Sequence, residues 1–205
     1  FYLFDPMFGN TELKPEKSEG WDAGVEQFLL DYRLSLGITY FSIRFNDMFG
    51  MDKNYKTVNI NKAESNGVEA YINYSVPQSY ALRLNYTYTY AVDKSDESPE
   101  KDLLLIRRPM HKASLEVNYT PIEEINLNGS LVYVGAREDK DFSNYLAVRT
   151  TLPEYTLFNI AASYKLSRNV SLQARLENVF DKYFEDILYY GTMGRNFALG
   201  INLSY

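Results

Sequence analysis

A period of two in the side-chain pattern is the feature that most constrains the fold of this chain. Apolar or aromatic residues alternate with polar ones over long stretches, which places the two kinds on opposite faces of an extended strand. In the clearest stretch, one face carries Tyr80, Leu82, Leu84, Tyr86, Tyr88 and Tyr90. The other face carries Ala81, Arg83, Asn85, Thr87 and Thr89. Helical spacing is absent from this stretch and from those like it, so we interpret them as β-strands.

The alternation predicts about nine strands. Their ranges are roughly 20–29, 32–48, 58–76, 80–92, 111–120, 125–137, 155–166, 170–179 and 194–205. Several of them reach or exceed the ~9–11 residues that a tilted strand needs to cross a bilayer. The mean strand of a soluble domain has only ~5–6 residues. An all-β fold of long strands is therefore expected.

The connections between these strands alternate in length. The short turns lie at Asp31, 77–79, 121–124 and 167–169. The long polar connections lie at about 49–57, 93–110, 138–154 and 180–193. We therefore expect an antiparallel meander, with every strand paired to its sequence neighbour and all long loops at one end. Outer-membrane β-barrels have this arrangement, with short periplasmic turns and longer extracellular loops.

A soluble β-sandwich also has one apolar and one polar face, so the alternation alone leaves both architectures open. The strand lengths, the alternating loops and the tyrosines near strand ends favour the barrel. These tyrosines are Tyr40, Tyr74, Tyr86, Tyr88, Tyr90, Tyr119, Tyr133, Tyr164 and Tyr205. In a barrel they would form girdles in the lipid headgroups, whereas a sandwich core would need buried partners for their hydroxyls.

Charged residues within the strands are expected to line a polar barrel interior. They are Arg83, Glu116, Lys165, Arg175 and Glu177. An Arg or Lys that faced lipid at the midplane would cost ~2–4 kcal/mol. The alternative is that these residues form the wet face of a soluble sheet.

An odd count of strands does not close a bacterial single-chain barrel, which usually has an even number. Either a strand near residues 1–10 is missing from the prediction, or the rest of the barrel lies upstream. We favour the second, because the chain starts at Phe1 without an initiator Met or a leader and reads like the middle of a loop.

The composition excludes several classes of function. The absence of Cys excludes disulfides, thiolate metal sites and Cys nucleophiles. His111 is the single His, and no Ser-His-Asp set or phosphate-binding glycine loop is apparent, so we do not expect an enzyme. A net charge of −6 without a basic cluster argues against nucleic acid as a partner. No run of ~18 apolar residues is present, which excludes helical membrane spans.

Acidic residues cluster in the second long connection. They are Asp93, Asp96, Glu97, Glu100 and Asp102. Their oxygens could coordinate calcium. A solvated acidic loop is the favoured interpretation, so no metal site and no cofactor are predicted. At the strand-to-loop corner of 178–182, Asn178 and Asp181 are expected to satisfy backbone groups.

Four segments resemble those of TonB-dependent outer-membrane receptors. They are 9–18 (N-x-x-L-K-P-E-x-S), 62–69 (K-A-x-x-x-G-V-E), 105–113 (L-x-R-R-P-x-H-K) and 177–185 (similar to N-L-F-D-K-x-Y-E). Gly194-Arg195 and a last strand that ends in an aromatic residue follow them. Each motif is weak alone, but their order and spacing over essentially the whole chain are specific.

The resemblance implies that residues 1–205 are the C-terminal part of a transmembrane β-barrel of 22 strands, filled by an N-terminal plug. It implies a place in the outer membrane of a Gram-negative bacterium, with lipid around the barrel. A small-molecule substrate would bind at the loops and the plug, and TonB would pull on a box in the plug to drive uptake. Neither the plug nor that box is in this sequence.

Within the family, residues 133–145 resemble the Y-x-G-x-R-x-D-K-D-Y-S-x-Y segment of cobalamin receptors. The resemblance implies two substrate contacts. Arg107 aligns with an Arg that contacts the corrinoid, and Phe142 aligns with a substrate-contacting Tyr, whose hydroxyl it lacks. The alternatives are a rim Arg107 paired with a loop acid such as Asp102, and a Phe142 that packs within its loop.

The segment from Leu188 to Tyr205 corresponds to the family's C-terminal box. Its apolar face consists of Phe197, Leu199, Ile201, Leu203 and Tyr205. The terminal aromatic resembles the signal that the outer-membrane assembly machinery reads.

The ligand and the class of barrel stay open at this point. We favour a receptor for cobalamin or a related corrinoid. The alternatives are a ferric siderophore receptor of the same family and, less favoured, a barrel for secretion or adhesion.

Overall fold

The computed structural model is all-β and describes residues 5, 7, 9–51, 56–96, 98–143 and 146–204. Nine strands form one large sheet. They are β1 (Lys17–Leu29), β2 (Leu34–Met51), β3 (Thr57–Val76), β4 (Tyr80–Asp93), β5 (His111–Ile122), β6 (Ile125–Val134), β9 (Tyr155–Lys165), β10 (Val170–Glu177) and β13 (Asn196–Leu203). The described residues contain no helix long and apolar enough to span a membrane.

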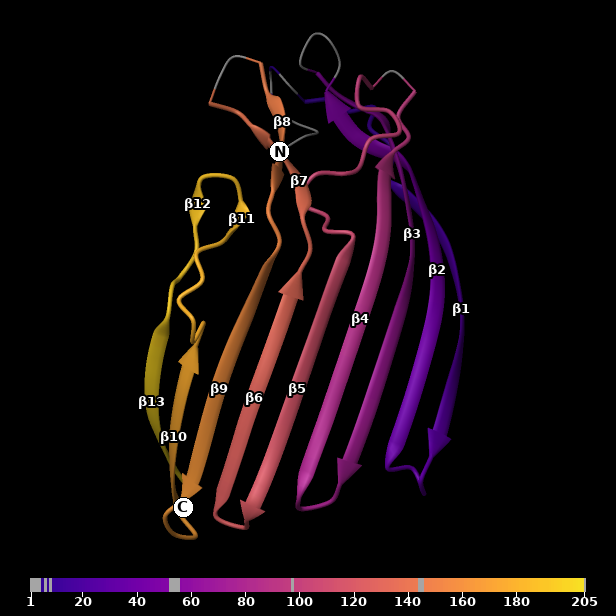
Figure 1. Cartoon of the computed structure of the whole chain (residues 1–205). Helices are drawn as coiled ribbons and strands as arrows, with labels where there is room; N and C mark the ends of the chain where they lie inside the picture. The colour runs from indigo at the N-terminus through magenta and orange to yellow at the C-terminus, as the bar shows by residue number, and fades with distance from the viewer. Residues whose placement is uncertain are drawn as a thin grey trace.

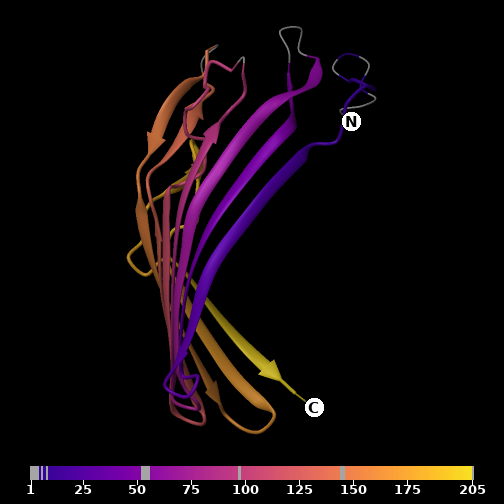
Figure 2. The same cartoon turned by 90° about the vertical axis from the view of Figure 1, so that its right-hand side faces the viewer.

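The sheet is an antiparallel meander, as the alternating connections predict. Its strand order is β1-β2-β3-β4-β5-β6-β9-β10-β13, so each strand pairs with the next long strand of the sequence. The short turns lie at one end of the sheet and the long loops at the other (Figure 1). Seen from the side, the sheet is curved, and its edge strands β1 and β13 lie on the same side of the middle strands (Figure 2).

Four short strands lie within the long connections and were not predicted. β7 (Arg137–Asp141) pairs with β8 (Val148–Leu152), and β11 (Glu185–Ile187) pairs with β12 (Tyr190–Gly191). The strand prediction at 125–137 is therefore wrong at its end, because β6 stops at Val134 and Arg137 begins the hairpin. The described residues between 9 and 16 contain no strand, while much of the 1–10 region lies outside the described residues.

The register lines up residues of one kind into rows that cross the sheet. One apolar row joins Leu84, Leu115, Leu131 and Phe158 from β4, β5, β6 and β9. The neighbouring polar row joins Arg83, Glu116, Ser130 and Asn159 from the same strands. The predicted separation of polar and apolar faces is therefore present across strands as well as along them.

The apolar rows are not covered by a second layer in the described part of the chain. Leu131 is 38% exposed and Ile160 is 41% exposed. The hydrophobic residues that are buried are few: Ala63, Ala91, Val92, Val134, Leu152 and Tyr155. A soluble sandwich would bury its inner rows between two sheets. The sandwich alternative is therefore wrong for this sheet.

Aromatic residues border the apolar rows at both ends. Near the short turns, the rings of Tyr74 and Tyr80 lie 5.5 Å apart, and Tyr119 is the cross-strand partner of Tyr80. Near the long loops, the rings of Tyr88 and His111 lie 5.2 Å apart. Tyr88 lies eight positions after Tyr80, which is about 27 Å along a strand. With the tilt of barrel strands, this span is close to the apolar band of about 25 Å in outer-membrane barrels.

Residues 9–18, the first of the family-like segments, are fastened to the loop ends of β2 and β3. The side chain of Asn59 accepts a hydrogen bond from the Lys14 amide and donates to the Lys14 carbonyl, each at 2.8 Å. It also donates to the carbonyl of Asp47, at 2.6 Å. The Glu16 carboxylate accepts from the amide of Phe49 at 2.8 Å. The side chains of Asn59 and Glu16 therefore fix the entry of the chain into β1.

Candidate functional site

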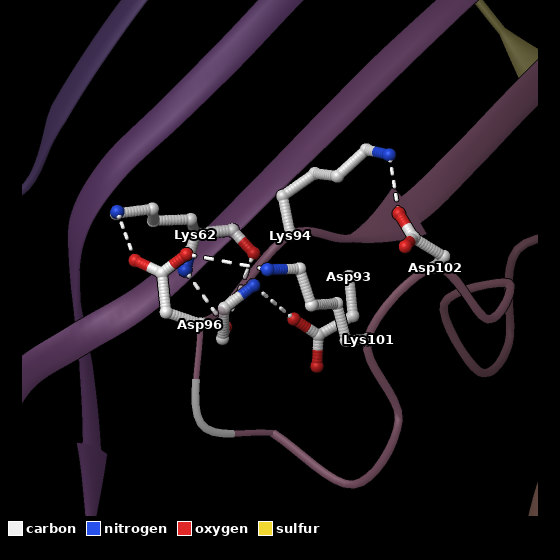
Figure 3. A network of polar contacts seen from close by, with 7 residues as sticks. Lys62, Asp93, Lys94, Asp96, Lys101 and Asp102 are labelled. Carbon is white, nitrogen blue, oxygen red and sulfur yellow. Dashed lines mark hydrogen bonds and ion pairs between the residues drawn. The ribbon is translucent and has the colours of Figure 1, made fainter.

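The loop that follows β4 is held against the first residues of β3, at the loop end of the sheet. The amide of Lys62 donates to Oγ of Ser95 at 2.9 Å, and the amide of Lys94 donates to the Lys62 carbonyl at 2.9 Å. The Lys62 ammonium forms an ion pair with Asp96 at 2.6 Å (Figure 3). Ser95 is buried, although it lies in a loop. These contacts give the loop a defined conformation on the rim of the sheet.

Two acidic residues of this loop, Asp96 and Asp102, pair with different lysines. Lys101 also pairs with Asp96, at 3.3 Å, and Lys94 pairs with Asp102 (Figure 3). The hydrogen bond from Lys62 and then that from Lys101 lower the pKa of Asp96. No group of three or more potential metal ligands occurs among the described residues, which do not include Glu97. The calcium alternative therefore gains no support from the placement of these side chains.

The β7–β8 hairpin is tied to this loop by a second network. Glu100 pairs with Lys140 of β7 at 2.8 Å and with Arg149 of β8 at 3.3 Å. Arg149 also pairs with Glu138 at 3.4 Å and donates to the carbonyl of Leu104. These ion pairs join two long loops that are distant in sequence, and both side chains of each pair are partly buried.

Asp139 lies at the centre of the loop contacts and its side chain is fully buried. Its carboxylate accepts hydrogen bonds from Nε of Arg107 at 2.9 Å and from the amides of Lys140 and Leu188 at 2.8 Å each. Burial by itself would raise the pKa of this carboxyl, but the hydrogen bonds from Leu188, Lys140 and Arg107 outweigh it and lower the pKa. One ionised side chain therefore joins three loops.

Arg107, one of the two predicted substrate-contacting residues, is placed at the base of the β4–β5 loop. Its backbone has a positive φ of 59°, and its amide donates to the carbonyl of Glu138 at 2.6 Å. Its side chain pairs with a loop acid, as the alternative interpretation expected, but that acid is Asp139. The partner named from the sequence, Asp102, is bound by Lys94 instead.

Arg137 fastens the other side of the hairpin to the β10–β13 connection. It is 4% exposed, and its guanidinium lies 5.3 Å from the ring centre of Tyr155 and 3.3 Å from the Asp186 carboxylate. It also donates to the carbonyl of Glu185. The hydroxyl of Tyr155 donates to the same Asp186 carboxylate at 2.8 Å. The hairpin is thereby held from both sides.

Phe142, the second predicted contact residue, follows β7 directly and is 63% exposed. The preceding residue, Asp141, accepts hydrogen bonds from the amide of Ser143 and from the hydroxyl of Tyr189, each at 2.8 Å. Arg107 and Phe142 are therefore both attached to β7, the first through Asp139 and the second through the chain itself. The ion pairs that Asp139, Glu100 and Arg137 make between loops were not predicted from the sequence, although the alternating charges of 137–141 could have indicated them.

Residues 2–179 match the family model described as TonB dependent receptor-like, beta-barrel. The chain belongs to this family. TonB-dependent receptors are outer-membrane β-barrels of Gram-negative bacteria that act in transport. The nine-stranded meander therefore corresponds to a part of the β-barrel of this receptor family.

Solved structures of receptors have the same fold. The ferric-catecholate import receptor Fiu of Escherichia coli K12 aligns with a TM-score of 0.78 and 20% identity, over 97% of this chain and 29% of that one. The ferripyoverdine receptor of Pseudomonas aeruginosa aligns with a TM-score of 0.78 and 20% identity, over 95% and 28%. The siderophore receptor PiuA of Acinetobacter baumannii aligns with a TM-score of 0.75 and 22% identity, over 96% and 30%. The chain spans less than a third of the length of each receptor.

The corner after β10 in this TonB-dependent receptor chain has the role predicted for it. Asn178 is 4% exposed and in the left-handed region, with φ 49°. Its amide side chain accepts from the Lys182 amide at 2.8 Å and donates to the Lys182 carbonyl at 2.9 Å. Asp181 accepts from the amide of Arg195 at 2.7 Å. The prediction that Asn178 and Asp181 satisfy backbone groups here is confirmed.

The segment predicted to be the C-terminal box, Leu188 to Tyr205, includes the edge strand β13. This strand pairs with β10 from Asn196 to Leu203, and in the described sheet its other side has no strand partner. Four apolar residues of the box are among the exposed large hydrophobics: Phe197, Leu199, Ile201 and Leu203. The fifth, Tyr205, lies outside the described residues.

Proposed function

We propose that this chain forms the C-terminal barrel wall and four extracellular connections of a longer receptor in a Gram-negative outer membrane. The observation that carries the proposal is the pair of faces on the sheet: exposed apolar rows on one and polar rows on the other. Contact of the apolar rows with lipid costs little free energy, whereas their contact with water is unfavourable. The interlocked loops then stand on the extracellular side, where the ligand arrives.

The proposal includes strands and a plug upstream of this chain. Its support is that the aligned receptors are more than three times as long as this chain. We expect the longer polypeptide to contain enough further strands for a barrel of 22, a plug domain and a TonB box. Sequencing the coding region upstream tests this, and an upstream region without a plug would favour the secretion or adhesion class.

We propose cobalamin or a related corrinoid as the ligand. The support is the resemblance of 133–145 to cobalamin receptors, together with the attachment of both candidate contact residues to β7, Arg107 through its ion pair with Asp139 and Phe142 through the chain. Phe142 offers an exposed ring for apolar contact, and Arg107, which is paired with Asp139 of the same hairpin, offers hydrogen-bond donors. Loops that are already fixed in place would lose little conformational entropy when a ligand binds.

A ferric siderophore is the second candidate ligand. It is favoured by the aligned structures, which are those of a ferric-catecholate import receptor, a ferripyoverdine receptor and a siderophore receptor. Their identities to this chain are 20–22%, so they support the family fold more strongly than a choice of cargo.

Titration of the full-length receptor with cyanocobalamin and with a ferric catecholate chelate tests the ligand. We expect cyanocobalamin to bind, and Arg107→Ala and Phe142→Ala each to weaken binding about tenfold. Leu146→Ala is the matched control, because Leu146 is also an exposed apolar residue of the same loop. Binding of the ferric chelate without binding of cyanocobalamin would transfer the proposal to the second candidate.

We also propose that β13 carries the signal for insertion by the outer-membrane assembly machinery. Deletion of Tyr205 in the full-length receptor should reduce the amount of folded barrel in outer membranes, and Tyr205→Phe should not, because it keeps the aromatic ring. Normal insertion after the deletion would refute this role.

A further inference from the structure

The guanidinium of Arg107 is held at one nitrogen and free at the other two. Its Nε donates to Asp139 at 2.9 Å. Within the described part of the chain, no hydrogen bond or ion pair joins Nη1 or Nη2 of Arg107 to another group. The side chain is 37% exposed, so these two nitrogens can reach a ligand. A guanidinium fixed at Nε presents its remaining donors in one plane and one direction.

The loops that carry Arg107 and Asp139 are already joined by other contacts. Glu100 pairs with Lys140 and Arg149, and the hydroxyl of Tyr189 donates to Asp141. The Arg107 amide is fixed as well, through the carbonyl of Glu138. Docking of the hairpin therefore does not depend on Asp139 alone. Asp139 also accepts from the amide of Leu188, but that connection is held to the hairpin by Arg137 and Tyr189 as well. The Arg107 side chain is oriented by its ion pair with Asp139.

We propose that Asp139 is a positioning residue, which orients Arg107 so that Nη1 and Nη2 bind an oxyanion of the transported ligand. This inference rests on the proposed function and deepens it by naming the chemistry of the ligand group. Guanidinium and carboxylate, phosphate or other oxyanions form paired, charge-assisted hydrogen bonds. The phosphodiester of a cobalamin and the ionised catecholate oxygens of a ferric chelate are both acceptors of this kind, so the test includes both.

The burial of Asp139 makes its effect on Arg107 strong. The side chain is completely inaccessible to solvent, and it accepts hydrogen bonds from two backbone amides in addition to that from the Arg107 guanidinium. Because a buried carboxylate without a cation would be costly, the pair with Arg107 is maintained at neutral pH. The two amides fix the carboxylate in turn, so it cannot follow Arg107 into other rotamers.

A double-mutant cycle in the full-length receptor tests the inference, with cyanocobalamin and a ferric catecholate chelate as separate probes. Asp139→Asn keeps the shape of the side chain and removes its charge. We expect Asp139→Asn and Arg107→Ala each to lower the affinity for the probe about tenfold. In the double variant we expect no loss beyond that of Arg107→Ala alone. Glu100→Gln is the matched control: it breaks the other ion pairs between the same loops, and binding should stay within about twofold of wild type.

The cycle separates positioning from a merely structural role. If Asp139 only held the loops together, its substitution would weaken binding further in the Arg107→Ala background, and Glu100→Gln would act in the same way. Either of these results would overturn the inference. So would an Asp139→Asn variant that binds like the wild type while Arg107→Ala binds weakly.

Trypsin cleavage after Arg107 gives a readout that needs no ligand. Pairing with Asp139 should protect the Arg107 side chain, so Asp139→Asn should speed this cleavage severalfold and Glu100→Gln should not, as followed by mass spectrometry. If neither probe binds to the wild type, the proposed ligand classes fail, while faster cleavage still supports the role of Asp139. Unchanged cleavage would overturn that role whatever the ligand is.

Discussion

Asp139 illustrates how a single residue can stabilise several loops. A buried carboxylate is tolerated only when its charge is matched and its oxygens are hydrogen-bonded. Asp139 meets both conditions, because it accepts from Arg107 and from the amides of Lys140 and Leu188. The three donors come from three separate parts of the chain. Removal of the carboxylate would therefore release all three at once.

The pH dependence of the loops follows from the lowered pKa of Asp139. The folded-state pKa lies below the ordinary value of 3.8, so the ionised carboxylate stabilises the folded loops above pH 3.8. This stabilisation is lost as the pH falls through the lowered folded-state pKa. We expect the protection of the Leu188 amide against hydrogen exchange to be constant from pH 7 to pH 5 and to fall only below pH 3.8.

Asp139→Asn is the control for this pH dependence, because it leaves Asp141 in place. The variant should give weaker protection of Leu188 at neutral pH and should lack the component that Asp139 contributes below pH 3.8. Loss of protection in the wild type between pH 7 and pH 5 would contradict the assignment.

Asn178 should contribute to stability through its side-chain amide. Asn178→Ala removes two hydrogen bonds to the backbone of Lys182 and places an alanine at a positive φ, which Ala adopts less readily than Asn. We expect the free energy of unfolding of the full-length receptor, measured with urea in lipid, to fall by about 1–3 kcal/mol. Lys182→Ala is the matched control and should be nearly neutral, since only the backbone of Lys182 takes part. Equal effects of the two substitutions would argue against this role.

At the scale of elements, periodicity predicts those strands that have one apolar and one polar face. The alternation in 80–92 therefore gave β4 almost to the residue. β7 could not be found this way, because its sequence Arg137-Glu-Asp-Lys-Asp is charged throughout and has no apolar face. β7 is held by backbone pairing with β8 and by ion pairs to other loops. Such contacts depend on the tertiary arrangement.

The candidate site was predicted in part for the same reason. The resemblance named Arg107 and Phe142, and the structure attaches both to one hairpin, although their role as ligand contacts stays a prediction. The partner of Arg107 could not be chosen from sequence distance. Asp102 is near in sequence, but Asp139, 32 residues away, is the acid that the folded loops bring to Arg107. A single sequence does not report which loops touch.

Two strand glycines provide a test of how closely neighbouring elements approach. A Cβ on Gly67 of β3 would meet the carbonyl of Tyr88 and the ring of Phe41, whereas a Cβ on Gly129 of β6 would have no neighbour within 4 Å. Gly67→Ala should therefore lower the yield of folded receptor in outer membranes severalfold, because a backbone carbonyl cannot move aside easily. Gly129→Ala should give wild-type yield. The opposite order would contradict the register of β2, β3 and β4.

At the scale of the whole molecule, the sheet leaves more apolar surface open than a soluble protein does. The exposed large hydrophobics occur on every long strand of the sheet, while the buried hydrophobic residues number six in the described chain. Soluble monomers rarely expose contiguous apolar patches beyond a few hundred Å². Lipid against the apolar face and a polar barrel interior against the other face together explain why polar and apolar rows alternate across the sheet.

A spin-label accessibility scan along β5 tests this central claim most directly. The chain has no Cys, so single Cys substitutions from Ser114 to Asn118 label one site each in the full-length receptor in lipid. Collision with oxygen, which is concentrated in lipid, should be high at Leu115 and Val117 and low at Ser114, Glu116 and Asn118. Collision with a water-soluble nickel chelate should be low at Leu115 and Val117. Low accessibility of Leu115 and Val117 to both reagents would mean that these rows pack against protein, and would contradict the account.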